Sequence, residues 1–84
     1  MADKQLSVRI VSLQKTLFDG PAQSVYLPGT VGAFEVLPGH AAIISSLEKG
    51  TIGVRNTDGS LVSIDISFGV AKVRNDEVTI CAAR

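Results

Sequence analysis

The chain has 84 residues, of which 45% are hydrophobic and 19% charged, and its 8 Lys and Arg balance its 8 Asp and Glu. A chain of this size forms one domain, and this composition is that of a globular protein rather than of a disordered one. With a formal net charge of zero, the chain has no overall field that would attract DNA, RNA or anionic lipid, so we expect no nucleic-acid partner.

Alternation of apolar and polar residues with period two predicts β-strands along most of the chain. The clearest case is the segment 61–68, which we expect to form one half-buried strand. Residues 41–47 lie between Pro38-Gly39 and Gly50 and are too few for an independent helix, so we expect a strand there too. The residues expected on the buried sides of the strands are, in chain order, Leu6, Val8, Ile10, Ile52, Val54, Val62, Ile64, Ile66, Phe68, Val78 and Ile80.

Pairs of residues typical of turns divide the chain into pieces of strand length. Asp58-Gly59 gives the strongest hairpin signal and Asn75-Asp76 the next strongest. A single sheet of such strands would leave an apolar face in water. The sequence therefore predicts an all-β fold, a flattened β-sandwich or barrel of about eight to ten short strands in two sheets. We expect one domain over residues 6–83, preceded by a short extension over residues 1–5.

The single cysteine and single histidine limit the chemistry available. Cys81 has no partner for an internal disulfide, which fits a reducing compartment, and at the end of an apolar strand it is expected to be a small core residue. One Cys and one His do not make a Cys/His metal site. No segment has the length and hydropathy of a signal peptide or a membrane-spanning helix, so we expect no direct membrane insertion.

We find no pattern that predicts an enzyme: there is no nucleophile elbow, Walker loop or pair of metal-binding histidines. His40 follows Pro38-Gly39, and we interpret it as a turn histidine bonded to local backbone rather than a catalytic group. The run Gly29-Thr30-Val31-Gly32 precedes an expected strand and not a helix, so it predicts a hairpin or bulge rather than a phosphate site. We therefore expect no catalytic, metal or cofactor site.

Residues 27–40 carry a more specific pattern. A glycine, two variable residues, a second glycine and a short apolar strand lead to Pro38-Gly39-His40, and this run resembles the signature of the epsilon subunit of F-type ATP synthases. The order of the flanking segments is similar to that family as well, over residues 6 to 83. These segments are 8–12 with 17–20 as an opening hairpin, 41–52 as the next two strands and 66–70 as a closing hairpin.

The resemblance implies a sandwich of two mixed or antiparallel sheets, with ten strands, at the foot of the central stalk. A member of the family is a non-catalytic rotor part that binds the gamma subunit and contacts the membrane c-ring during proton-driven ATP synthesis. It is a peripheral subunit on the cytoplasmic face of the energy-coupling membrane, either the bacterial plasma membrane or the equivalent side of an organelle membrane. By position, the gamma-facing residues are Ser12, His40, Ala41 and Ser45, and the ring-facing residues are Gly29, Thr30, Val31, Gly32 and Ala33.

Two departures from the family pattern change what is expected. Many relatives have an acidic residue where this chain has Ala33, and a glycine or glutamine where it has Glu35. Glu35 either supplies the ring-contact carboxylate from a position two residues along the same strand face or is a solubilising edge charge. The sequence has no counterpart of the family's C-terminal helical hairpin, so we expect neither autoinhibition by that hairpin nor nucleotide binding.

Other classes of small β domain fit less well. A lipoyl or biotinyl carrier domain is the main alternative, but its lysine occupies an Asp-Lys-Ala or Met-Lys-Met setting, and Lys49 lies in Glu48-Lys49-Gly50. An oligonucleotide-binding barrel needs aromatic residues interleaved with basic ones. None of the four aromatic residues lies within two positions of a Lys or Arg; they are Phe18, Tyr26, Phe34 and Phe68.

Overall fold

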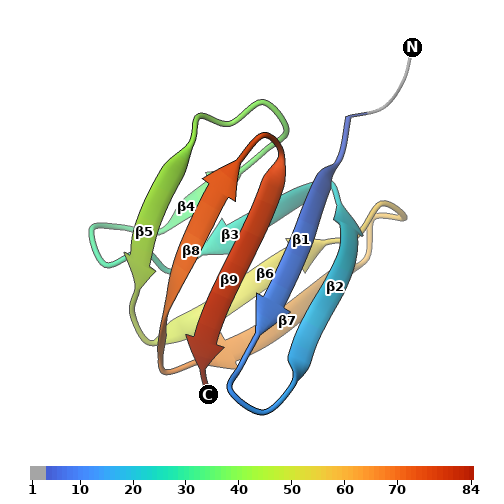
Figure 1. Ribbon diagram of the computed structural model, residues 1–84. Coiled ribbons are helices and arrows are strands. Elements are labelled where there is room, and N and C mark those ends of the chain that lie inside the picture. Colours follow the sequence, from blue (N-terminus) through green and yellow to red (C-terminus); the bar gives the residue numbers. More distant parts are fainter. Residues whose placement is uncertain (1–3) are drawn as a thin grey trace.

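The computed structural model describes residues 4–84, and this part of the chain contains nine β-strands in two facing sheets and no helix (Figure 1). Of the expected extension over residues 1–5, only Lys4 and Gln5 belong to the described residues. The strands are β1 (Leu6–Val11), β2 (Thr16–Ala22), β3 (Ser24–Leu27), β4 (Phe34–Val36), β5 (Ile43–Leu47), β6 (Gly50–Arg55), β7 (Leu61–Ile66), β8 (Phe68–Arg74) and β9 (Glu77–Ala83).

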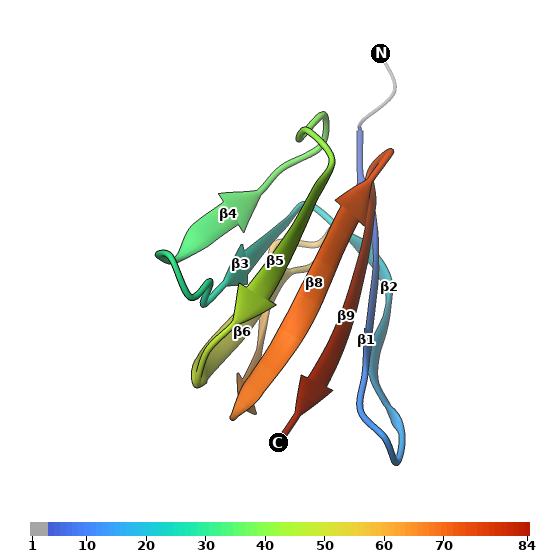
Figure 2. The same cartoon turned by 60° about the vertical axis from the view of Figure 1, so that its left-hand side comes forward.

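The two sheets differ in size and in strand direction. The larger sheet has the order β2-β1-β9-β8-β5, and the smaller sheet has the order β4-β3-β6-β7. Strands β1 and β9 pair in parallel, and the other neighbours pair antiparallel. In Figure 2 the strands β3, β4 and β6 form one layer and β8, β9, β1 and β2 the other. The predicted all-β sandwich is confirmed, with nine strands in the described residues where the resemblance implied ten.

The core lies between the sheets and is built from alternate residues of each strand. Across the parallel pair, Val8 lies opposite Val78 and Ile10 opposite Ile80, and all four side chains are buried. Each such side chain contributes about 1.5–3 kcal/mol when it is fully removed from water. The buried hydrophobic residues are Leu6, Val8, Ile10, Ala22, Val25, Leu27, Val36, Leu47, Ile52, Val54, Ile64, Ile66, Ala71, Val73, Val78, Ile80 and Ala82.

Two sequence expectations about burial are wrong. Phe68 was expected to continue the buried side of the strand that ends at Ile66, but it is 64% exposed. The chain crosses from the smaller sheet to the larger one at Ser67, so the alternation restarts there, and residues 66–70 are a crossover and not a closing hairpin. Cys81 was expected in the core but is exposed, because the inward residues of β9 are its neighbours Ile80 and Ala82.

The strongest predicted turns are hairpins in the structure. Asn75 and Asp76 have positive φ values of 51° and 61° and join β8 to β9 as a two-residue turn. This is the conformation that Asn and Asp adopt at the least cost among residues with a side chain. The turn is also fixed from outside, since the Gly39 N–H donates to the Asp76 carboxylate at 2.7 Å and the Ser7 N–H donates to the Asp76 carbonyl at 2.8 Å.

The Asp58-Gly59 turn between β6 and β7 contains a carboxylate with a lowered pKa. The Ser60 hydroxyl donates to Asp58 Oδ1 at 2.7 Å and the Ser60 N–H donates to the same oxygen at 2.8 Å. Both bonds favour the ionised carboxylate, the side-chain bond most, and so they hold the Asp58 pKa below its ordinary value. The resulting stabilisation is present above the pKa of the unfolded chain and is lost as the pH falls through the lower pKa of the folded chain.

We expect Ser60→Ala to raise the Asp58 pKa part of the way toward its ordinary value, because the hydroxyl bond is lost while the backbone N–H bond remains. The measurement is an NMR titration of the Asp58 carboxyl carbon. Ser63→Ala removes a hydroxyl from an exposed position on the adjacent strand and should leave the Asp58 titration as it is. Identical Asp58 titration curves in wild type and Ser60→Ala would contradict this account.

Candidate functional site

The outward side of the larger sheet is apolar along one half. Pairing across the strands puts Val11, Cys81 and Val70 in one row, and Phe68 lies on the same side opposite Ala83. Ile44 on β5 faces outward as well and is 72% exposed; it lies opposite Lys72, at the border with the charged half, and diagonally next to Val70. Exposed apolar side chains that are contiguous across several strands are typical of a contact surface. We call this surface the outer apolar face and define it as Val11, Ile44, Phe68, Val70 and Cys81.

The other half of the same sheet side is charged, with both signs present. The row next to Cys81 and Val70 contains Thr79 and Lys72, and this row continues to Arg9 on β1. An apolar area bordered by polar and charged groups is the usual composition of a protein interface. The charged side chains on this half are Arg9, Asp19, Lys72, Arg74 and Glu77.

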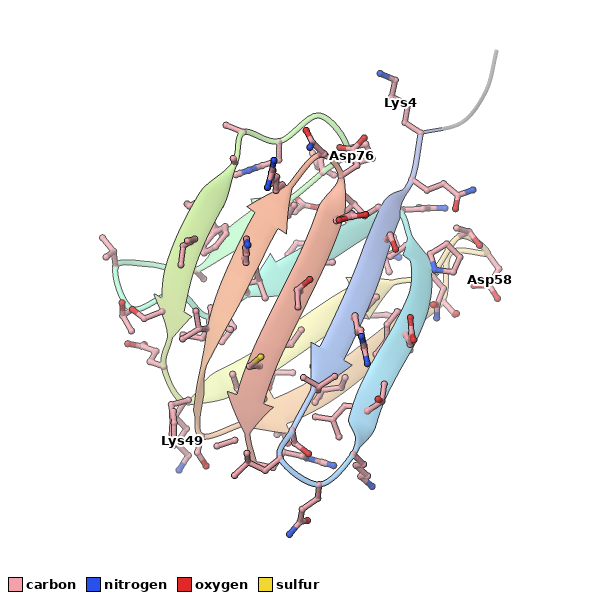
Figure 3. The ribbon with its side chains drawn as sticks, in the orientation of Figure 1. Lys4, Lys49, Asp58 and Asp76 are labelled. Carbon is pink, nitrogen blue, oxygen red and sulfur yellow. The ribbon has the colours of Figure 1, made fainter. Side chains whose placement is uncertain are left out.

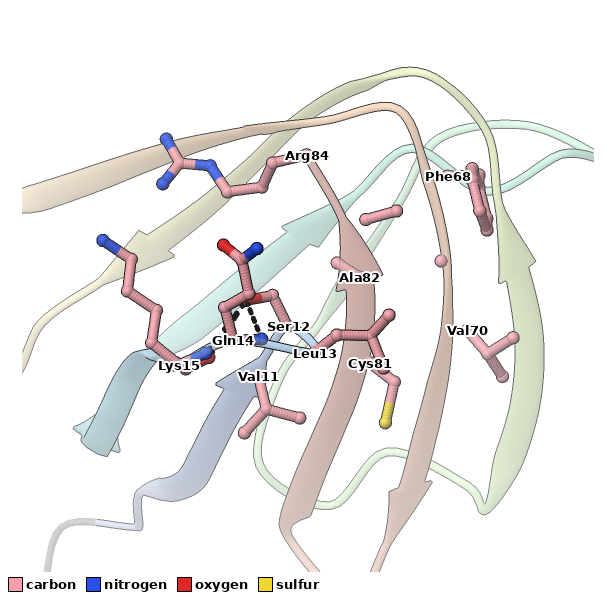
Figure 4. A pocket seen from close by; sticks show the side chains of 12 residues that line it. Val11, Ser12, Leu13, Gln14, Lys15, Phe68, Val70, Cys81, Ala82 and Arg84 are labelled. Carbon is pink, nitrogen blue, oxygen red and sulfur yellow. Dashed lines mark hydrogen bonds between the residues drawn. The ribbon is translucent and has the colours of Figure 1, made fainter.

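An open hollow of about 890 Å³ lies at the end of the outer apolar face, beside the β1–β2 turn (Figure 4). The turn is fixed by Ser12, whose Oγ accepts from the Lys15 N–H at 3.2 Å and donates to the Lys15 carbonyl at 3.2 Å. Leu13 is fully exposed at this turn. Lys15 and Arg84 also line the hollow, so its apolar surface is bordered by positive charge.

The four residues predicted to face the gamma subunit do not form one cluster. Ser12 lies in the β1–β2 turn, at the end of the sandwich opposite to the β4–β5 loop, which carries His40 and Ala41 (Figure 1). Ser45 lies on β5 opposite the buried Ala71, so its side chain points inward and is half-buried. His40 Nδ1 donates to the Ala41 carbonyl at 2.7 Å, which is the local backbone bond expected of a turn histidine.

Sequence reasoning missed the members of the outer apolar face. The alternation on β8 places Val73 and Ala71 in the core and Phe68 and Val70 outside, so the strand is apolar on both sides at one end. That two-sided pattern was visible in the sequence. It becomes informative only when the crossover at Ser67 is known, because the crossover decides which side faces the core.

The loop predicted to face the ring joins β3 to β4 and projects from the sandwich. Its tip is exposed at Thr30, Val31, Gly32 and Ala33, whereas Gly29 is buried. A Cβ on Gly29 would lie 2.7 Å from the Gly32 carbonyl oxygen, so only glycine allows this tight turn. The expected hairpin at these glycines is confirmed, since β3 and β4 pair antiparallel on either side of the loop.

Glu35 lies away from the tip of this loop. It is on β4, opposite Tyr26, and its exposed side chain is on the outward side of the smaller sheet. Ala33 precedes β4 and is not part of the strand. Ala33 and Glu35 are therefore not two positions on the same face of one strand, which the sequence pattern predicted. Figure 3 shows the side chains of the whole sandwich, with Lys49 exposed at the β5–β6 turn.

Within residues 4–84, no three His, Cys, Asp or Glu side chains are grouped as metal ligands. The same residues contain no helix that is long and apolar enough to span a membrane.

Known proteins share both the sequence and the fold of this chain. Residues 5–84 match the family model of the ATP synthase delta/epsilon chain β-sandwich domain. The ATP synthase epsilon chain of Synechococcus elongatus is 43% identical over 75 residues, which cover 89% of this chain and 54% of that relative. The epsilon chain of Thermosynechococcus vestitus is 41% identical over 75 residues, with the same coverage of 89% and 54%. The chain thus spans about half the length of the curated relatives it matches.

Two solved structures have the same fold. One is the Euglena gracilis mitochondrial ATP synthase, described as OSCP/F1/c-ring, in which a chain matches with a TM-score of 0.89 and 22% identity over 95% of this chain and 51% of that chain. The other is the central stalk and c-ring of the Tetrahymena thermophila mitochondrial ATP synthase, with a TM-score of 0.79 and 16% identity over 100% of this chain and 67% of that chain. The predicted resemblance is confirmed: the chain belongs to the ATP synthase delta/epsilon chain β-sandwich domain family.

Proposed function

We propose that the chain is a non-catalytic rotor part of an F-type ATP synthase, which binds the gamma subunit and contacts the c-ring so that stalk and ring turn together. The observation that carries this proposal is the outer apolar face, which remains exposed on a domain of the epsilon-chain family. A monomer gains nothing in stability from exposing such a surface, whereas a subunit held in a stalk covers it with its partner.

We place the gamma contact on β5 and the adjoining outer apolar face. Ile44 is the most exposed large apolar residue on β5, and it lies between the predicted contact positions Ala41 and Ser45. Val70 on β8 is a diagonal neighbour of Ile44 and is 49% exposed. His40 extends the same edge beyond the start of β5, and Ser12 belongs to the hollow at the far end of the face.

We place the c-ring contact on the loop of residues 29–33. Thr30, Val31, Gly32 and Ala33 present an exposed tip without charge, and the buried Gly29 determines its shape. Glu35 lies outside this tip, on the outward side of the smaller sheet. This position favours a solubilising edge charge over a ring-contact carboxylate.

A rotor part of this kind is a peripheral subunit of a membrane-embedded complex. We place it on the cytoplasmic face of the energy-coupling membrane, either the bacterial plasma membrane or the equivalent side of an organelle membrane. The solved assemblies that share its fold are described as containing c-rings, which supports a position beside the membrane.

The alternative of a lipoyl or biotinyl carrier domain is not supported. Lys49 is exposed at a turn, as a carrier lysine would be. However, the family model that matches residues 5–84 is that of the ATP synthase delta/epsilon chain β-sandwich domain, and the relatives at 43% and 41% identity are epsilon chains.

The proposal is tested by titrating the chain with the gamma subunit of the same organism in a calorimeter. We expect saturable one-to-one binding that Ile44→Glu weakens by about 30-fold or more, because burying an unpaired charge at an interface centre costs about 2 kcal/mol or more. Ala41→Glu should weaken binding in the same direction.

Leu61→Glu is the matched control, because Leu61 is another exposed large aliphatic residue but lies on the smaller sheet. It should leave the affinity for gamma unchanged. Equal affinities of Ile44→Glu and wild type, or no association of the folded wild type at micromolar concentrations, would refute the proposed contact.

A further inference from the structure

The 29–33 loop is bonded to a strand of the other sheet and not only to its own hairpin. Pairing between β3 and β4 ends at Leu27 and Phe34, which leaves the residues between them without partners in the smaller sheet. Gly29 instead forms an antiparallel bridge with Leu47, the last residue of β5 in the larger sheet. The loop therefore closes the corner between the two sheets.

Three hydrogen bonds hold the base of the loop to β5 and the residue after it. The Glu48 N–H donates to the Pro28 carbonyl at 2.9 Å, and the Thr30 N–H donates to the Ser46 carbonyl at 3.1 Å. The hydroxyls of Thr30 and Ser46 share a hydrogen bond of 2.8 Å. Of the side chain to side chain hydrogen bonds found in residues 4–84, this is the one that joins the two sheets.

The bonded pair lies between the two surfaces assigned above. Ser46 is two residues from Ile44, and both side chains point outward from β5 because Ser46 is opposite Val70 and Ile44 is opposite Lys72. Thr30 is adjacent to Val31, the fully exposed residue at the loop tip. A displacement of β5 is thus passed to the loop through the bonds at Pro28 and Thr30, without first crossing the core and strands β6 and β3.

We propose that Thr30 and Ser46 are positioning residues that fix the ring-contact loop to the gamma-contact strand, so that rotation of gamma is transmitted directly to the c-ring contact. This inference rests on the proposed function. Loops held by few hydrogen bonds open locally at little cost, and opening of this loop would let gamma turn without carrying its ring contact along. The hydroxyl pair reduces that opening at the residue next to the tip.

Ser46→Ala is the variant that tests this role, because it removes the hydroxyl pair and leaves the predicted ring-contact residues intact. The chain is assembled with the other subunits of the complex in lipid vesicles, and proton pumping is measured per ATP hydrolysed. We expect Ser46→Ala to lower this ratio at least twofold. Amide exchange at Thr30 and Gly32, whose N–H groups donate to the Ser46 and Gly29 carbonyls, should become at least about fivefold faster in the assembled complex, since local opening sets that rate.

Thr51→Val is the matched control. It removes the hydroxyl bond of 2.7 Å between Thr51 and Asp65, which lies within the smaller sheet and does not join the sheets. It should change neither the pumping ratio nor loop exchange. An unchanged pumping ratio in Ser46→Ala, with gamma bound, overturns the positioning role, whereas failure of the wild-type chain to bind gamma overturns the proposed function instead.

A reversible disulfide cross-link distinguishes a loss of transmission between β5 and the loop from a loss of folding. Cysteines at Thr30 and Ser46, in a Cys81→Ser background, face each other where the hydroxyls now meet, so oxidation should join loop and strand. The oxidised complex is expected to pump at least twofold more protons per ATP hydrolysed than the reduced complex, in one sample. Equal ratios in the two redox states would overturn the inference.

Discussion

Replacing Ile80 by alanine is expected to lower the free energy of unfolding by about 2–5 kcal/mol. Ile80 is fully buried at the middle of β9, opposite Ile10 on one neighbouring strand and Ala71 on the other. Because strands on both sides fix the backbone here, the site cannot collapse around the smaller side chain, and a cavity remains. A domain of this size has a total stability of roughly 4–13 kcal/mol, so the loss is a large fraction of it.

The loss is measured by urea unfolding followed by far-UV circular dichroism. Ile44→Ala is the control, since it makes the same truncation on the same sheet at a side chain that is 72% exposed. It should change the free energy of unfolding by less than about 0.5 kcal/mol. Similar losses for Ile80→Ala and Ile44→Ala would show that the core is not located where the burial pattern puts it.

Adding a single methyl group at Gly69 is expected to destabilise the fold by about 1–3 kcal/mol. A Cβ at this position would lie 2.7 Å from the Cys81 carbonyl oxygen and 3.2 Å from the Ala82 Cα. Both are backbone atoms of the neighbouring strand β9, so no side-chain rotation relieves the contact. Strands β8 and β9 must move apart, which weakens the pairing at the end of the outer apolar face.

Gly20→Ala is the control for this experiment. Gly20 also lies in a strand of the larger sheet, but the nearest heavy atom to its Cβ would be the Phe18 ring at 4.0 Å. Thermal unfolding should therefore show a lower midpoint for Gly69→Ala and little change for Gly20→Ala. A Gly69→Ala protein as stable as wild type would contradict the close approach of β8 and β9.

The sequence predicts the local parts of this fold well, because their causes are local. Alternation identifies the buried residues Val78 and Ile80, which depend only on strand geometry. The turn at Asn75-Asp76 follows from the tolerance of these residues for positive φ. The sandwich itself follows from the number of strands and their apolar sides.

The parts that the sequence does not predict depend on contacts between distant segments. The exposure of Phe68 follows from a change of sheet at Ser67, and alternation contains no information on which sheet a strand joins. The bond between Thr30 and Ser46 joins a loop to a strand with which it shares no hairpin. For the same reason, the family signature does not indicate that the β1–β2 turn with Ser12 and the β4–β5 loop with His40 lie at opposite ends of the sandwich (Figure 1).

The parallel pairing of β1 with β9 has a consequence for how the protein forms. The strands at the centre of the larger sheet come from the two ends of the described chain, so their pairing closes a loop that includes nearly all other residues. Closing so long a loop costs conformational entropy, so this pairing forms late in folding. Proteins dominated by contacts between distant residues fold in milliseconds to seconds rather than microseconds. During synthesis on the ribosome, the β1–β2 hairpin emerges before β9, so one edge of β1 remains unpaired until Glu77–Ala83 has been made.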